Sequence, residues 1–133
     1  IIPKDTFEKL SKKYDLVVFS GRLIKEARYS LEKFNIDKFF NYFITMDNLD
    51  KSQLKPSPWG LEQIKTHCPY KTIKYLGDSV DDIKAGIAAN VETIGVVPIG
   101  ANYNAMNQEF KNLGAKYVIK DIRKIIKFLK EVK

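Results

Sequence analysis

The sequence contains only one cysteine, Cys68, and one histidine, His67. A disulfide needs a second cysteine and a cysteine-based zinc site needs several, so the composition excludes both kinds of structure. A chain with one cysteine suits a reducing compartment, and we expect the protein to be cytoplasmic. His67 lies beside Cys68 at the end of a predicted helix, where a capping or surface role is a better interpretation than catalysis.

Long apolar segments are also missing from the sequence. It has no run of about eighteen apolar residues that would span a bilayer, and its first residues do not form a charged segment that leads into an apolar signal core. The sequence therefore predicts no membrane partner.

Arginine is scarce, although the chain is basic. Only Arg22, Arg28 and Arg123 are arginine among 23 basic residues, so the other twenty (23 − 3) are lysine, and the formal net charge is +7. Recognition of bases and phosphates relies heavily on arginine, and the lysines form no block of five or six like charges. This pattern favours solvated helix faces and makes a nucleic-acid or anionic-surface binder the least favoured function.

What the sequence does contain is a regular alternation of apolar strands and amphipathic helices. Its 133 residues, 44% of them hydrophobic, are enough for one domain with a real core. Strand, helix, strand, helix in repetition predicts parallel strands with helices on both faces, that is, one doubly wound α/β domain over residues 1–133. The predicted strands are centred on residues 16–19, 42–45, 73–76, 92–97 and 117–119.

The segment 73–82, Ile-Lys-Tyr-Leu-Gly-Asp-Ser-Val-Asp-Asp, carries three carboxylates directly after a predicted strand. Clustered acids at the carboxyl end of a strand are typical of functional sites in α/β proteins. A purely structural interpretation is also open, in which Ser79 or Asp78 caps the next helix and Asp81 and Asp82 are first-turn acids favoured by the helix dipole.

Three predicted strand ends carry polar signals in a fixed order: Ser20-Gly21, then Lys55-Pro56, then Gly77-Asp78 with Asp82. In this order and spacing they resemble motifs two, three and four of the haloacid dehalogenase (HAD) superfamily of phosphohydrolases. The segment 77–86 is similar to the acidic motif of the phosphoglycolate phosphatase subfamily. The resemblance extends through nearly the whole chain and implies a Rossmann-like core and a Mg²⁺-dependent phosphatase of a small phosphorylated metabolite.

The residue types suit the roles that the resemblance implies. Ser20 and Gly21, at a strand-to-helix turn, would hold phosphoryl oxygens, because the start of a helix presents free N–H donors. Without the other motifs, an N-cap would be the better interpretation of Ser20. Lys55, before a proline that restricts the backbone, would offset negative charge as a catalytic residue. Asp78 would ligate Mg²⁺, and Asp82, four residues on, would be the second catalytic residue, which holds Lys55 or a metal-bound water.

The superfamily's first motif, two aspartates one residue apart at the end of a strand, does not occur here. In the superfamily the first of these aspartates is the nucleophile. Asp15 precedes its strand and would lie at the amino end, away from the site, so we find no nucleophile in this chain. The aspartates are at positions 5, 15, 37, 47, 50, 78, 81, 82 and 121.

The family's first strand lies between the strands that end at Ser20 and Asp78, so we expect the central strand of the sheet to be missing. Unpaired strand edges are costly when buried. The sequence begins at Ile1 without methionine, and we expect a C-terminal fragment whose site is completed by an N-terminal segment. Two alternatives stay open: the flanking strands pair directly, or the chain is a non-catalytic module that binds phosphate and metal.

Three further residues have open roles. Arg22 is a possible substrate contact or a solvent-facing helix residue, Asp47 is a possible residue at the rim of the site, and Trp59 packs on the core or lines a pocket.

Overall fold

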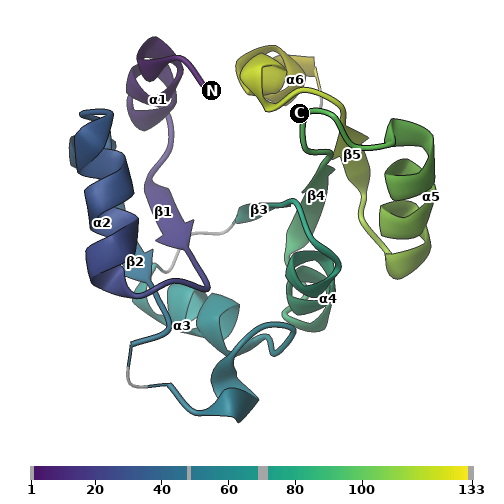
Figure 1. Cartoon of the computed structure of the whole chain (residues 1–133), viewed down its shortest axis with the longest axis horizontal. Helices are drawn as coiled ribbons and strands as arrows, with labels where there is room; N and C mark the ends of the chain where they lie inside the picture. Colours follow the sequence, from purple (N-terminus) through teal and green to yellow (C-terminus); the bar gives the residue numbers. More distant parts are fainter. Residues whose placement is uncertain (1, 48, 69–71, 132–133) are drawn as a thin grey trace. The chain divides into compact units, whose positions relative to one another are not determined.

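The computed structural model describes residues 2–47, 49–68 and 72–131, which form two compact units (Figure 1). The first unit contains the described residues up to Leu49 and those from Arg123 onward. The second unit runs from Asp50 to Ile122. Among the described residues, no helix has the length and apolar character needed to cross a membrane.

The first unit contains a two-stranded parallel sheet, in which Val17 pairs with Tyr42 and Phe19 with Ile44. Aromatic residues fill the space beside these strands. The rings of Phe7 and Phe40 are 5.6 Å apart, and the guanidinium of Arg28 lies 4.6 Å from the ring centre of Phe43. The helices and strands of this unit are α1 (Lys4–Ser11), β1 (Leu16–Phe19), α2 (Ile24–Lys33), β2 (Phe40–Ile44) and α6 (Ile125–Glu131), with the 3₁₀ turn η1 (Asp37–Phe39) before β2.

The second unit contains a three-stranded parallel sheet in the order β3-β4-β5. Figure 1 shows α4 and α5, in green, beside these strands. The elements of this unit are η2 (Lys51–Gln53), α3 (Trp59–His67), β3 (Lys74–Gly77), α4 (Val80–Ala88), β4 (Glu92–Val96), α5 (Tyr103–Leu113) and β5 (Tyr117–Ile119).

Helices α4 and α5 pack on one face of this sheet, where small residues allow a close approach. A Cβ atom at Gly86 of α4 would lie 2.1 Å from Oγ1 of Thr93, and one at Gly95 of β4 would lie 2.5 Å from the ring of Phe110. Tyr75 pairs with Thr93 and Gly77 with Gly95, so all four residues face α4 and α5. A core of Ile83, Phe110 and Ala115 lies on the same side.

Residues with left-handed backbone follow two of the helices. Asn90, after α4, has a φ of 55°, and Gly114, with φ of 111°, ends α5, as is typical of glycine. The final helical segment combines two geometries. Its first turn is the 3₁₀ segment η3 (Ile122–Lys124), and the α-helical part begins at Ile125.

The predicted α/β class with parallel strands is confirmed. In the residues that the structure describes, β1 pairs with β2 in the first unit, and β3, β4 and β5 form the sheet of the second unit. The alternative that β1 and β3 pair directly stays a prediction. A Rossmann-like core that lacks strands fits this arrangement.

Candidate functional site

The turn between β3 and α4 is the centre of the candidate site in the second unit. β3 ends at Gly77 and α4 begins at Val80, with Asp78 and Ser79 between them. The hydroxyl of Ser79 accepts a hydrogen bond from the backbone N–H of Asp82 at 3.1 Å, so Ser79 is the N-cap of α4. The capping interpretation is therefore correct for Ser79, which leaves the carboxylates of Asp78 and Asp82 for other roles.

Asp82 lies directly over Gly77. A Cβ atom at position 77 would come within 2.4 Å of the Cβ of Asp82, so only glycine leaves room for this side chain. One carboxylate oxygen of Asp82, Oδ2, accepts a hydrogen bond from the backbone N–H of Asp78 at 3.1 Å. Asp82 is therefore fixed against the end of β3, and the residue as a whole is only 7% exposed.

Lys55 and Asp82 form a partly buried ion pair. The ammonium of Lys55 donates to Oδ1 of Asp82 at 2.6 Å, and the two side chains are 17% and 10% exposed. Lys55 lies in the loop before α3, and its peptide bond to Pro56 is cis. The structure thus brings together two predicted site residues that are far apart in the sequence.

Tyr75 is a member of this cluster that the sequence analysis did not identify. Its hydroxyl donates to the same Oδ1 of Asp82 at 2.8 Å, and the residue is 8% exposed. The available signal was the strand period of two, because a tyrosine two positions before Gly77 lies on the same face of β3.

The pKa directions in the cluster follow from its hydrogen bonds and charges. Burial acts to raise the pKa of Asp82, but the hydrogen bond and charge of Lys55, with the Tyr75 hydroxyl and the Asp78 N–H, outweigh it and lower the pKa. Partial burial and then the negative charge of Asp82 raise the pKa of Asp78. Burial and Asp82 also raise the pKa of the Tyr75 hydroxyl, which stays a hydrogen-bond donor at neutral pH.

The donor set at this turn fits a metal ion only in part. Mg²⁺ takes one or two protein carboxylates and keeps several waters, so a carboxylate that is only partly buried, such as that of Asp78, suits it. Within the described part of the chain, no group of three or more histidine, cysteine, aspartate or glutamate residues is arranged to hold a metal. Asp78 is thus suited to be one ligand among others from elsewhere.

Ser20, Gly21 and Arg22 lie in the first unit, in the loop between β1 and α2. The Ser20 hydroxyl accepts a hydrogen bond from the Arg22 N–H at 3.1 Å, and the Ser20 N–H donates to the carbonyl of Ile44. A Cβ atom at Gly21 would meet no atom within 4 Å. Packing within the described structure therefore does not require glycine at position 21, and the open space suits the approach of a ligand.

Asp47 caps α2, a role that the sequence analysis did not assign to it. Its Oδ2 accepts hydrogen bonds from the N–H of Ile24 at 2.7 Å and from the Thr45 hydroxyl at 2.6 Å. These two hydrogen bonds, with Thr45 the stronger cause, lower the pKa of Asp47. Because Asp47 binds the first residue of α2, Ser20 is not needed as its N-cap.

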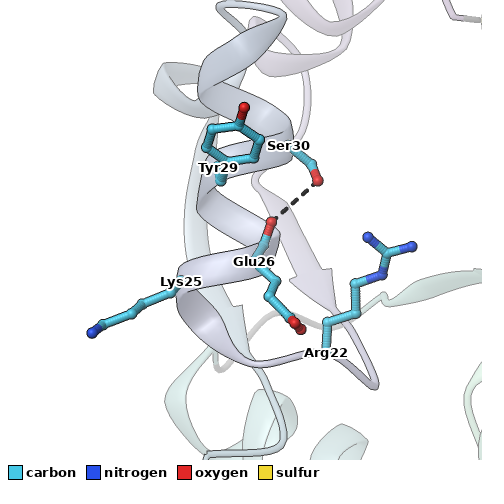
Figure 2. Close-up of a pocket in the computed structure, with 5 residues that line it drawn as sticks. All are labelled: Arg22, Lys25, Glu26, Tyr29 and Ser30. Atoms are coloured by element: carbon cyan, nitrogen blue, oxygen red, sulfur yellow. Dashed lines mark hydrogen bonds between the residues drawn. The ribbon is translucent and has the colours of Figure 1, made fainter.

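Arg22 borders an open hollow along α2 of about 470 Å³ (Figure 2). Figure 2 shows the side chains of Arg22 and Lys25 extending to opposite sides, so they do not converge on a common anion. The role of Arg22 as a substrate contact stays a prediction.

Trp59 and His67 lie at the two ends of α3. The backbone N–H of Trp59 donates to the Ser57 hydroxyl at 3.2 Å, and Pro58 is the N-cap of the helix. His67 is exposed, and its Nδ1 lies 2.9 Å from the carbonyl of Gln63 within the same helix.

Residues 3–96 match the family described as haloacid dehalogenase-like hydrolase. The chain belongs to this family. Pyrophosphatase PpaX of Oceanobacillus iheyensis is 30% identical over 125 residues, which cover 92% of this chain and 56% of that protein. The resemblance found in the three strand-end motifs is thereby confirmed.

Solved structures of this family share the fold. A predicted phosphoglycolate phosphatase from Haemophilus somnus aligns with a TM-score of 0.77 and 26% identity, covering 95% of this chain and 55% of that chain. The HAD-hydrolase YfnB from Bacillus subtilis, in a structure bound to magnesium, aligns with a TM-score of 0.75 and 18% identity, covering 95% and 52%. The chain therefore spans little more than half the length of the relatives it matches.

Proposed function

We propose that this HAD-like chain supplies the phosphate-binding and metal-binding part of a Mg²⁺-dependent phosphohydrolase of a small phosphorylated metabolite. The observation that carries this proposal is the 2.6 Å ion pair between Lys55 and Asp82, beside Asp78 at the carboxyl end of β3. An ammonium fixed in a partly buried position can stabilise the charge of a transferring phosphoryl group. The names of the relatives, a pyrophosphatase and a phosphoglycolate phosphatase, support phosphate-ester or phosphoanhydride chemistry.

Each site residue has a distinct role in this proposal. Lys55 offsets the charge of the phosphoryl group, and Asp82 holds Lys55 in place. Ser20 and Gly21 bind phosphoryl oxygens, which the open space at Gly21 supports. Arg22 contacts the rest of the substrate.

Asp78 is the proposed Mg²⁺ ligand in this chain. When bound, Mg²⁺ would neutralise charge on the phosphoryl oxygens. The raised pKa of Asp78 supports this role, because partial burial and then the negative charge of Asp82 disfavour its ionised carboxylate, which a nearby cation would stabilise.

The nucleophile and the remaining metal ligands come, in this proposal, from a segment outside the 133 residues. No two aspartates of the sequence are separated by a single residue. We propose that this segment adds the central strand, that residues 1–133 form one α/β core with it, and that the chain by itself is inactive.

The test is phosphate release from p-nitrophenyl phosphate with Mg²⁺. The 133-residue chain should release none, whereas the protein that includes its upstream coding sequence should be active and should lose activity on Asp78→Ala. Asp81→Ala is the matched control, because Asp81 is an exposed neighbour on α4 and should be replaceable. Release by the 133-residue chain, abolished by Asp78→Ala, would refute the absence of a nucleophile.

A second candidate function is a non-catalytic module that keeps the phosphate and metal pocket. The absence of an Asp-x-Asp motif favours it. The coding sequence upstream of Ile1 distinguishes the two candidate functions. A predicted strand that ends in Asp-x-Asp supports the enzyme, and its absence supports the binding module.

A further inference from the structure

We propose that Tyr75 is a positioning residue for Lys55 and acts through Asp82. Its importance for catalysis rests on the proposed phosphohydrolase function, whereas the positioning itself requires neither phosphate nor metal.

The alternation of side chains along β3 places Tyr75 and Gly77 on the face of the strand where Asp82 packs. Tyr75 and Gly77 face α4, and the missing side chain at Gly77 lets the stem of Asp82 lie against the strand. From two residues earlier on the same face, the buried Tyr75 places its hydroxyl 2.8 Å from Oδ1 of Asp82. A phenylalanine would fill the same space but would leave Oδ1 without this donor.

Groups of β3 and of the turn between β3 and α4 donate hydrogen bonds to both carboxylate oxygens of Asp82. Tyr75 donates to Oδ1, and the backbone N–H of Asp78 donates to Oδ2 at 3.1 Å. Rotation about the bond between Cβ and the carboxylate is otherwise broad, and two fixed donors remove this freedom. Oδ1 therefore points in a defined direction, independently of Lys55.

Lys55 reaches this oxygen from the loop before α3, which also belongs to the second unit. Its long stem has much rotamer freedom, which is costly to restrict without a fixed acceptor. With Oδ1 held by Tyr75, the ammonium meets a fixed acceptor at 2.6 Å. The positive charge is thus placed beside Asp78, where the proposed phosphate and metal would need it.

The test measures how fast the ammonium protons of Lys55 exchange with water, by NMR on the isotope-labelled 133-residue chain. Exchange requires opening of the ion pair, so Tyr75→Phe should accelerate it about five-fold, the effect of losing one ordinary hydrogen bond. Thr93→Val is the matched control, because Thr93 is the paired residue on β4 and its buried hydroxyl donates to the carbonyl of Val91. This control should leave Lys55 unchanged.

Each outcome decides the proposal. Unchanged exchange in Tyr75→Phe would mean that Tyr75 does not position Lys55. Slower exchange would mean that Tyr75 only competes with Lys55 for Oδ1. Either result would overturn the proposal. Equal acceleration in Thr93→Val, or loss of the fold in Tyr75→Phe, would show a general stabilising role and would also overturn it. Because no phosphate or metal is added, a failed phosphatase assay would leave this result intact, and the two failures are distinguishable.

Discussion

At the scale of single residues, Asp82 combines three kinds of interaction on one carboxylate. It accepts from the charged Lys55, the neutral hydroxyl of Tyr75 and the backbone of Asp78. A buried carboxylate with several donors stays ionised, and losing its cation leaves an expensive charge. The stability of the fold and the position of the proposed catalytic lysine therefore depend on the same atoms.

Lys55→Met should lower the free energy of unfolding by about 3 kcal/mol, because it leaves Asp82 ionised in a mostly buried position without its cation. Urea titration measures this change. Lys84→Met, at an exposed position of α4, is the control and should stay within about 0.5 kcal/mol of the wild type. A loss below about 1 kcal/mol for Lys55→Met would mean that the pair behaves like a solvated surface ion pair.

Asp78→Asn should raise the melting temperature at pH 7 while it weakens Mg²⁺ binding. The pKa of Asp78 is raised in the folded state by partial burial and by Asp82, so its ionised form is disfavoured on folding. This penalty is full above the folded pKa and disappears as pH falls toward the unfolded value of 3.8. The advantage of Asp78→Asn should therefore vanish toward pH 4 in thermal melts.

Asp81→Asn is the control for that comparison, since Asp81 is exposed on the same helix. If Asp78→Asn instead lowers the melting temperature at pH 7, the ionised carboxylate of Asp78 stabilises the fold, and the inferred penalty for its ionisation is wrong.

At the scale of helices and strands, the site depends on how closely α4 approaches β3. Gly77→Ala should cost about 1–3 kcal/mol, because the new Cβ would meet the Cβ of Asp82 rather than a flexible side-chain tip. Gly21→Ala should change stability by less than about 0.5 kcal/mol, since nothing lies within 4 Å of its Cβ position. Urea titrations of both variants make this comparison, and equal losses would contradict it.

The start of α2 shows how a loop from another strand can take over a capping role. Sequence spacing makes Ser20 a candidate N-cap, but Asp47, which follows β2, provides the acceptor for Ile24. The Ser20 hydroxyl instead accepts from Arg22 within its own loop. Local spacing cannot predict such a contact, because the partners are 23 residues apart and meet only when β1 and β2 pair.

At the scale of the whole molecule, the charge of +7 is carried mainly by dispersed lysines. Fluorescence anisotropy with a labelled DNA duplex should show only weak binding that changes less than about ten-fold between 50 and 200 mM salt. A true DNA binder with six to ten phosphate contacts would lose about a thousand-fold or more. A steep salt dependence would instead support the nucleic-acid binder, the function that the sequence favours least.

The sequence alone determined the type and order of the elements, because apolar periodicity, turn residues and caps are local signals. The parallel α/β class, the end of α5 at Gly114 and the Ser79 cap follow from such signals. The family resemblance also came from local motifs in order, and the match of residues 3–96 confirms it. The absence of an Asp-x-Asp pair is likewise a property of the sequence.

Only the tertiary structure decided which side chains share one carboxylate. Tyr75 and Lys55 are 20 positions apart (75 − 55), and they meet at Asp82 because Gly77 lets α4 lie against β3. It also decided that Asp47 caps a helix and which strands pair within each unit. These outcomes depend on packing between distant segments, and local residue preferences contain no information about that packing.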